Sequence, residues 1–336
     1  MSPTVSIILP TYNRARFLPQ AIASICSQQW TDWELIIVDD GSTDETAAII
    51  GGLTSPIQQP VTFIQQENRG AYGARNTGLD HATGKYIAFF DSDDEWLPHH
   101  LQDCVDALEA NPDVDWVYGA CRMIDDTSGT VLAENTFFTS AGPRPFLRLA
   151  TRAVGSLDVI VDAAAVECMI LHGLYSGLQN SVLRAEIFSD YRFDYETRNE
   201  AEDQLVVIRM LLAGRVFAYF NNVHVDYKVH DANSSAAARN QDLARQERVL
   251  RLMIDGYERL YRESGFPRVV RRALRQRIAR DCFWSQGYAT LWTAGKQRQA
   301  LQLFRRGLRY WPWDLRCWKT MLASTLRTWC SPPQIN

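Results

Sequence analysis

Hydrophobic residues in the first third of the chain alternate between short continuous runs and helical repeats. The continuous runs predict β-strands at residues 5–9, 33–39, 61–65 and 85–90. Between them, helical spacing predicts helices at residues 17–28, 44–52 and 71–82. Runs such as LIIV are apolar on both faces, which is typical of a parallel sheet covered by helices. The order of elements therefore predicts βαβ units and an α/β fold.

The pattern continues less regularly towards the middle of the chain. Helices are predicted at residues 97–110 and 201–213, and strands at residues 114–118 and 216–220. Residues 124–199 alternate loop-like segments with short apolar pieces and receive no assignment.

After a polar stretch, HDANSSAAARNQ, the chain reads as helical to its end. One helix there is amphipathic. Its apolar face holds Leu301, Phe304, Leu308 and Trp311, and its basic face holds Arg298, Arg305 and Arg309. We therefore expect an α/β domain over residues 1–235 and a helical region over residues 236–336.

Composition narrows the class of protein. Of 336 residues, 46% are hydrophobic and 22% charged, which excludes general disorder. Seven scattered cysteines without a C-x-x-C pair fit thiols in a reducing compartment. The first apolar run is too short for a signal peptide, and the longest, residues 159–171, is interrupted by Asp162 and Glu167. We expect a cytoplasmic protein.

The net charge of −4 is the sum over two parts of the chain whose net charges have opposite signs. The basic C-terminal segment, residues 267–336, carries a balance of +12, and the preceding residues carry −16. Six of the ten tryptophans also lie in this segment: Trp284, Trp292, Trp311, Trp313, Trp318 and Trp329. Two interpretations stay open: peripheral contact with the inner face of an anionic membrane, or packing of the helices against the catalytic domain. No nucleic-acid-binding motif accompanies the charge, so we expect no nucleic-acid partner.

Polar residues gather where three predicted strands end, at residues 10–14, 39–46 and 91–96. In an open parallel sheet, ligands bind beyond these carboxyl ends. No glycine-rich phosphate loop follows the first strand. Asp91 and Asp93 instead suit a divalent cation that carries a diphosphate. Residues 39–45 alone could also be a helix-capping loop, with Ser42 or Thr43 as the cap.

Several motifs together resemble the family-2 glycosyltransferases with the GT-A fold. They are VSIILPTYNR, WELIIVDDGSTDET, NRGAYGARNTGL, GKYIAFFDSDD, AEDQLVVIRMLLAG and YKVHDANSS. The resemblance covers roughly residues 5–235. It implies a Rossmann-like, mostly parallel sheet flanked by helices, with residues 1–235 as the catalytic domain and a C-terminal helical extension.

The resemblance also implies which residues bind the donor. Tyr12 would lie against the nucleobase, and Thr11 and Asp40 would contact the base and ribose. Arg75 would border the nucleotide. Asp91, the first acid of the D-x-D pair, would lie near the ribose.

The metal and the catalytic base follow from the same resemblance. Asp93 would be the more direct ligand of Mn²⁺ or Mg²⁺, with Asp91 and His230 beside it. Asp203 matches the general base that removes a proton from the acceptor hydroxyl. Other interpretations stay open: Asp203, like Glu202, could merely favour a helix N-terminus, and His230 could be an ordinary loop residue.

Three further histidines lie outside the family pattern. We expect His99 and His100, beside the acidic cluster, to be surface residues. His224, in a strand-like segment, is expected to pack in the interior.

The expected function is inverting, metal-assisted transfer of a sugar from a nucleotide-diphosphate donor to a glycan or lipid-linked acceptor. One alternative is a nucleotidyltransferase, which would release pyrophosphate. Another is a GT-A module that binds sugar without turnover, although all the expected acids are present.

Overall fold

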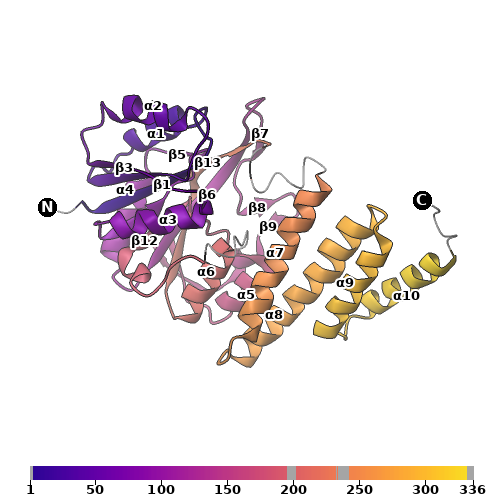
Figure 1. Ribbon diagram of the computed structural model, residues 1–336. Coiled ribbons are helices and arrows are strands. Elements are labelled where there is room, and N and C mark those ends of the chain that lie inside the picture. Colours follow the sequence, from indigo (N-terminus) through magenta and orange to yellow (C-terminus); the bar gives the residue numbers. More distant parts are fainter. Residues whose placement is uncertain (1–2, 195–201, 232, 234–241, 331–336) are drawn as a thin grey trace. The chain divides into compact units, whose positions relative to one another are not determined.

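The computed structural model describes residues 3–194, 202–231, 233 and 242–330, with the backbone alone at residues 327–330. The chain divides into two units (Figure 1). The α/β unit comprises residues 1–198 and 202–230, and the helical unit comprises residues 199–201 and 231–336. The expected domain boundary, between residues 235 and 236, lies outside the described residues.

The strands predicted in the first third form the parallel part of the sheet. β1 (Val5–Thr11) lies between β2 (Trp33–Asp39) and β4 (Tyr86–Phe89), and β2 also pairs with β3 (Val61–Gln65). All these pairings are parallel. Every residue of β1, β2 and β4 is buried, as expected for strands covered on both faces.

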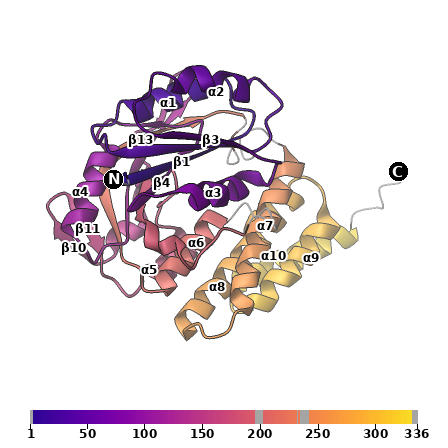
Figure 2. The same cartoon turned by 60° about the vertical axis from the view of Figure 1, so that its left-hand side comes forward.

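Helices cover the two faces of these strands. They are α1 (Leu18–Cys26), α2 (Thr46–Thr54) and α3 (Gly70–His81). α1 and α2 lie on one side and α3 on the other (Figures 1 and 2). Ile7 packs in the same cluster as Ile22 of α1, whereas Ile8 faces α3. A Cβ atom on Gly78 of α3 would lie 2.3 Å from Ile8 Cγ2, so glycine permits this close approach.

The α/β unit continues with further strands and helices. The remaining strands are β5 (Glu95–Trp96), β6 (Trp116–Asp125), β7 (Val131–Ala133), β8 (Phe138–Thr139), β9 (Gly142–Pro143), β10 (Thr151–Val154), β11 (Leu157–Ile160), β12 (Ser181–Arg184) and β13 (Phe217–Val229). The α-helices are α4 (His100–Ala110), α5 (Ala165–His172) and α6 (Glu202–Leu212), and the 3₁₀-helices are η1 (Pro145–Arg148) and η2 (Ala185–Phe188).

The complete sheet is mixed. Its order is β10-β11-β13-β6-β12-β4-β1-β2-β3, with β5 paired to β13 and β7 to β6. β12 lies antiparallel between β4 and β6. β6 therefore runs in the same direction as β4, and so does β13, which is parallel to β6. The predicted α/β fold is confirmed.

The helical unit is built from consecutive helices. They are α7 (Leu243–Arg262), α8 (Arg268–Arg280), the π-helix η4 (Asp281–Trp292), α9 (Gln297–Tyr310) and α10 (Leu315–Cys330). The amphipathic pattern predicted for α9 is confirmed: Phe304 and Leu308 are buried, and Arg305 and Arg309 are exposed. Phe304 stacks on Phe283 of η4, with ring centroids 4.2 Å apart. No helix in the described part of the chain combines the length and hydropathy needed to cross a membrane.

Candidate active site

The carboxyl ends of β1, β2, β4 and β13 lie at one edge of the sheet, because these strands run in the same direction. One residue after β4 begins an acidic segment, residues 91–95, in which all but Ser92 are acids, and Glu95 begins β5. β5 pairs with β13, with Trp96 opposite Val225. This pairing holds the acidic residues close to β13. His230 follows the last residue of β13 and therefore reaches the same edge.

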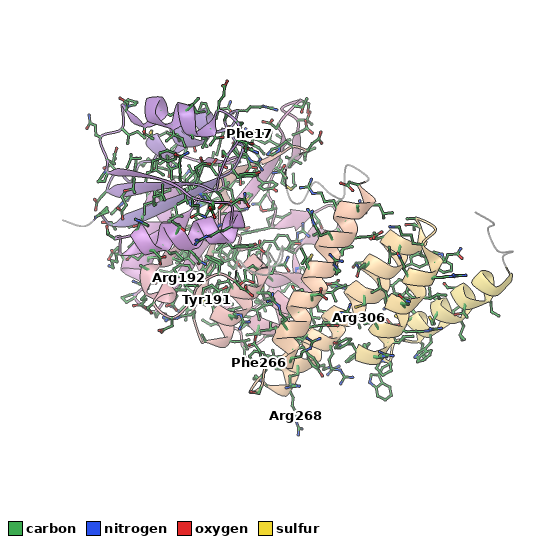
Figure 3. The ribbon with its side chains drawn as sticks, viewed as in Figure 1. Phe17, Tyr191, Arg192, Phe266, Arg268 and Arg306 are labelled. Carbon is green, nitrogen blue, oxygen red and sulfur yellow. The ribbon has the colours of Figure 1, made fainter. Side chains whose placement is uncertain are left out.

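Asp93 and His230 are in contact although 137 positions separate them in the sequence. His230 Nε2 lies 3.0 Å from Asp93 Oδ2, and Arg14 Nε lies 3.4 Å from the same oxygen. Phe17, labelled in Figure 3, stacks on the His230 ring at 4.5 Å between centroids. Burial alone would raise the pKa of the Asp93 carboxyl, but the His230 hydrogen bond and the Arg14 charge outweigh it and lower the pKa. Asp93 is therefore an anion at neutral pH.

Asp91 is paired with Arg75 of α3. Arg75 Nη2 lies 2.6 Å from Asp91 Oδ1, and the guanidinium lies over the Tyr72 ring, 5.2 Å from its centroid. Burial raises the pKa of Asp91, and the Arg75 charge opposes this rise without cancelling it. Within the described residues, the buried Arg75 Nε has no hydrogen-bond partner. Such a donor costs free energy until a ligand or water accepts its hydrogen bond.

Asp203, in the first turn of α6, reaches the same group of residues. Its backbone N–H donates to the Tyr72 hydroxyl at 3.3 Å, and its Oδ1 accepts from the Gln204 N–H at 2.9 Å. Burial raises the pKa of the Asp203 carboxyl, while the Gln204 amide and the Arg75 charge lower it in part. The structure thus brings Asp203 near Arg75 and Asp91.

The neighbouring acid, Glu202, has a different environment. Its carboxylate accepts from the Tyr191 hydroxyl at 2.8 Å and from the Asp194 N–H at 3.4 Å. Tyr191 and Arg192 lie in the segment before α6 (Figure 3). Glu202 therefore anchors this segment, whereas the Asp203 carboxylate interacts with Arg75.

Asp40 lies at the carboxyl end of β2 and is buried. Its carboxylate accepts from the N–H groups of Arg69 and Gly70 at 2.8 and 2.7 Å, and from Gln66 Nε2 at 2.7 Å. The Arg69 and Gly70 amides lie at the start of α3, where a negative charge is stabilising. The structure thus gives Asp40 an anchoring role at α3, and its contact with a ribose or base stays a prediction.

Thr11 and Tyr12 lie at the end of β1. Thr11 is buried, and its carbonyl accepts from the Asp40 N–H at 2.9 Å. Tyr12 is 44% exposed, so its ring is available to stack on a planar ligand. The next residue, Asn13, has a positive φ of 53° and receives the Thr43 N–H at 2.8 Å on its Oδ1.

Ser42 and Thr43 do not act as the helix caps that the sequence allowed, whereas Asp44 Oδ1 accepts the N–H of Thr46, the first residue of α2, at 2.9 Å. Ser42 Oγ accepts from the Asn13 N–H at 2.9 Å. Thr43 donates to Asn13, as described above. α2 begins only at Thr46, and neither Ser42 nor Thr43 caps it. The loop is therefore tied to the loop that follows β1.

Sequence reasoning missed Arg14, Tyr72 and Asp94. Asp94 is buried, and its Oδ1 accepts from the Lys228 N–H of β13 at 3.1 Å. Burial raises its pKa well above the ordinary value, and the charges of Asp93 and Asp91 add to the rise. Its place beside the D-x-D pair was visible in the sequence, but its inward direction was not.

The residues expected to hold a metal ion fit the chemistry of a hard cation. Carboxylate oxygens are the preferred ligands of Mg²⁺ and Mn²⁺. Asp93 is an anion in contact with His230, whereas Asp91 is turned into its ion pair with Arg75. Among the described residues, these three do not form one group within 4.8 Å. Of the three residues expected to hold a metal, Asp93 and His230 are therefore the two in contact.

One expectation about the histidines is wrong. His100 is fully buried, not on the surface, because α4 turns its first residue inward beneath Trp96, whose ring centroid lies 4.7 Å away. His99 is partly buried, and its Nε2 donates to the Val223 carbonyl at 3.1 Å. His224 is fully buried, as expected.

A mixed α/β sheet with acids, an arginine and a histidine at its carboxyl edge is typical of the class of α/β folds that bind a ligand there. Within that class, residues 6–172 match the model of the family described as Glycosyl transferase family 2. The chain belongs to this family, as the sequence motifs predicted.

One curated relative is the Escherichia coli UDP-Glc:alpha-D-GlcNAc-diphosphoundecaprenol beta-1,3-glucosyltransferase WfgD. It is 35% identical over 124 residues, which are 37% of this chain and 48% of the relative. Across the first curated relatives, the matched part spans only 37% to 48% of their own length.

Two of the solved structures that resemble this chain match more than nine-tenths of it. S. aureus TarS 1-349 in complex with UDP-GlcNAc has a TM-score of 0.61 at 17% identity, and the match covers 91% of this chain and 81% of that one. The mannosyltransferase PcManGT from Pyrobaculum calidifontis in complex with GDP-Man and Mn²⁺ has a TM-score of 0.58 at 20% identity, with 97% and 86% covered. These likenesses confirm the predicted GT-A fold.

Proposed function

We propose that the chain transfers a sugar from a nucleotide-diphosphate donor to a hydroxyl group of a glycan or lipid-linked acceptor, with inversion at the anomeric carbon. One observation carries the proposal: acids, an arginine and a histidine from four distant segments converge at one edge of the sheet. Asp93 and His230 meet there, and Asp203 lies near the Arg75–Asp91 pair.

The donor would bind through residues at the ends of the strands. The exposed Tyr12 ring would lie against the base, with Thr11 and Asp40 nearby. Arg75 would offer its unpartnered Nε to the donor. Asp93, with His230 and Asp91, would hold a divalent cation, and such a cation neutralises charge on a diphosphate leaving group.

Asp203 would be the general base. Its carboxylate takes the proton from the acceptor hydroxyl while the oxygen forms a bond with the anomeric carbon. The bond from that carbon to the diphosphate oxygen breaks, and its electron pair leaves with the nucleoside diphosphate. The raised pKa of Asp203 supports this role, because a base accepts a proton more readily as its pKa approaches the working pH.

The acceptor would be a glycan on a lipid carrier. The E. coli relative is named for an acceptor on diphosphoundecaprenol. The helical unit offers a matching surface: α10 exposes Leu315, Trp318, Leu322 and Leu326. Together with the basic C-terminal segment, this surface is suited to an anionic membrane interface. Phe283 and Trp292 of η4 instead pack against Phe304 of α9 within the helical unit, and the Trp329 side chain lies outside the described residues.

Product analysis tests the proposed reaction. Purified protein is incubated with a panel of nucleotide sugars, with Mn²⁺, with Mg²⁺ or with a chelator, and the released phosphates are identified. We expect a nucleoside diphosphate and a dependence on divalent cation. Release of pyrophosphate would indicate a nucleotidyltransferase instead. Binding of a nucleotide sugar without any release, even with lipid-linked acceptors present, would indicate a non-catalytic module.

A further inference from the structure

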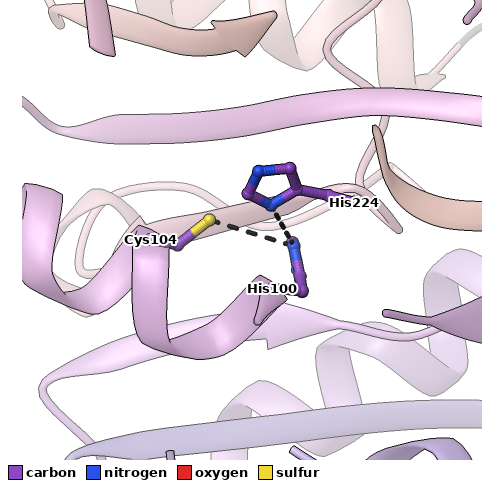
Figure 4. Close-up of side chains that lie close together, drawn as sticks. All are labelled: His100, Cys104 and His224. Atoms are coloured by element: carbon purple, nitrogen blue, oxygen red, sulfur yellow. Dashed lines mark hydrogen bonds between the residues drawn. The ribbon is translucent and has the colours of Figure 1, made fainter. Parts of the chain in front are cut away.

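Two histidines and a cysteine form a buried cluster in the α/β unit (Figure 4). His100 Nδ1 lies 3.2 Å from His224 Nδ1 and 3.9 Å from Cys104 Sγ. All three ligand atoms lie within 4.8 Å of one another. The three side chains are fully buried. The cluster takes no part in the proposed sugar transfer.

The fold directs these side chains toward one another. His100 and Cys104 are four residues apart on α4, so they lie on the same face of the helix. His224 comes from β13, at an irregularity where the register against β6 shifts on both sides of Val223. Such bulges commonly redirect a side chain.

The sheet also leaves space for the His224 ring. A Cβ atom on Gly119 of β6 would lie only 2.3 Å from His224 Cγ. Any side chain at this position would therefore displace the imidazole. The bulge in β13 therefore directs the His224 side chain, and Gly119 of β6 leaves room for its ring.

The cluster is not satisfied by its own hydrogen bonds. Two neutral imidazoles can share one proton between their Nδ1 atoms, but within the described part of the chain neither Nε2 has a hydrogen-bond partner. Burial lowers the pKa of both histidines, so both are neutral and have a lone pair to offer. The atoms that face one another are the two Nδ1 atoms and the Cys104 sulfur, and these are the atoms that a metal ion would join.

We propose that His100, Cys104 and His224 form a binding site for one Zn²⁺ or similar transition-metal ion. A tetrahedral zinc ion, with Zn–N of about 2.0–2.1 Å and Zn–S of about 2.3 Å, holds its ligand atoms roughly 3.3–3.6 Å apart. The separations of 3.2 and 3.9 Å lie close to this range. The third separation, between the ligand atoms of Cys104 and His224, is at most 4.8 Å.

A nearby carboxylate, that of Asp103, adds a second negative charge to that of the Cys104 thiolate and so balances the two positive charges of the proposed ion. Asp103 Oδ2 lies 3.8 Å from His224 Nε2. When the ion takes both Nδ1 lone pairs, each imidazole carries its proton on Nε2, and the Asp103 carboxylate, 3.8 Å from His224 Nε2, would have to move closer to accept that hydrogen bond. This carboxylate–histidine arrangement is common behind zinc ligands. Binding converts the Cys104 thiol to a thiolate and releases its proton to solvent, so affinity rises with pH.

The proposed zinc site differs from the carboxylate pair in chemistry. Two imidazoles and a thiolate favour Zn²⁺, Co²⁺ or Cu²⁺, whereas Asp91 and Asp93 favour Mg²⁺ or Mn²⁺. The ion would fasten α4 to β13, the strand that ends beside His230. Its role would therefore be to stabilise the strand that positions the active-site histidine.

Metal content tests the proposal directly. Tag-free protein is produced in medium with added zinc, dialysed and measured by elemental analysis and native mass spectrometry. We expect one zinc ion per chain, retained in Asp93→Ala but lost in Cys104→Ala. Cys121→Ala is the matched control, because Cys121 is also a buried thiol of the α/β unit and should leave the zinc in place.

Replacing the zinc with Co²⁺ gives a spectroscopic check. Wild type and Cys121→Ala should show a thiolate-to-cobalt charge-transfer band, and Cys104→Ala should not. Circular dichroism establishes that each variant is folded. If Cys104→Ala does not fold, X-ray absorption of the wild-type zinc protein decides instead, since a shell without sulfur would overturn the proposal. So would wild type without zinc, or an unchanged cobalt band in Cys104→Ala.

Discussion

Arg75 lies between two carboxylates to which we assign different roles. It pairs directly with Asp91, on the proposed donor side, and its charge also acts on Asp203, the proposed base. A buried cation in this position favours the ionised form of both acids. The single guanidinium can therefore keep two close acids charged, as the proposed reaction requires.

Asp203→Asn separates base catalysis from donor binding. The amide keeps the size of the side chain but cannot accept a proton at neutral pH. General-base catalysis is worth roughly 10²- to 10⁴-fold, so initial transfer rates should fall by about that factor. Nucleotide affinity, measured by calorimetry, should stay near wild type.

The neighbouring acid provides the control for this substitution. Glu202→Gln keeps an acceptor for the Tyr191 hydroxyl and should leave transfer largely intact. If both acids served only the helix N-terminus, each variant would lose about 1 kcal/mol or less of stability with little loss of rate. Lost nucleotide binding in Asp203→Asn would instead assign Asp203 to the donor site.

How far the site residues could be predicted depends on distance along the chain. Asp91 and Asp93 could be proposed because their spacing is local and follows a buried strand. Arg14 and Tyr72 could not be, because their contacts join loops and helices far apart in sequence and depend on side-chain direction. The prediction that His100 lies on the surface was wrong for the same reason, because acidic neighbours in the sequence do not show which face of a helix is buried.

At the scale of elements, strands with both faces buried were the most predictable. β1 and β2 are continuous apolar runs and were found almost to the residue. β13 was predicted only as residues 216–220, although it extends to Val229. Its second half contains polar residues, and its register against β6 shifts between Phe220 and Val225. Such irregular strands are set by their partners, which the local pattern does not contain.

Replacing glycine by alanine is expected to change the stability of the protein in opposite directions at Gly84 and at Gly52. A Cβ atom on Gly84, just before β4, would lie 2.6 Å from the backbone nitrogen of Ser6, which cannot move aside easily. Gly84→Ala should therefore destabilise the protein by about 1–3 kcal/mol. Gly52, exposed in α2, has nothing within 4 Å of its Cβ position. Gly52→Ala should stabilise by roughly 0.5–1 kcal/mol because alanine favours the helix.

Denaturant unfolding of the two variants beside wild type measures this difference. A Gly84→Ala midpoint at or above that of wild type would mean that the close approach of Gly84 to β1 is relieved by movement of the chain. A Gly52→Ala midpoint below that of wild type would contradict the helix-propensity argument. The far-ultraviolet spectrum of each variant serves as the control for an unchanged fold.

At the scale of the whole molecule, the C-terminal segment that carries the positive net charge also exposes apolar side chains on α10. The basic C-terminal segment carries +12. Within it, α10 exposes Leu322 and Leu326, one turn apart, at 62% and 64% of their surface. A lipid-linked acceptor would make such a surface useful, because the enzyme must meet its substrate at a bilayer.

Liposome flotation tests this surface. The full chain should float with vesicles rich in anionic lipid and less with neutral vesicles, and salt should weaken the binding. The double variant Leu322→Glu/Leu326→Glu should reduce binding at least roughly tenfold, since each buried leucine contributes about 1.5–3 kcal/mol.

Phe138→Glu is the matched control, because Phe138 is also an exposed apolar residue but lies in the α/β unit. Equal recovery with neutral and anionic vesicles would remove the membrane from the proposal. Transfer to a soluble acceptor analogue should be unchanged in both variants, because these residues lie outside the proposed catalytic site.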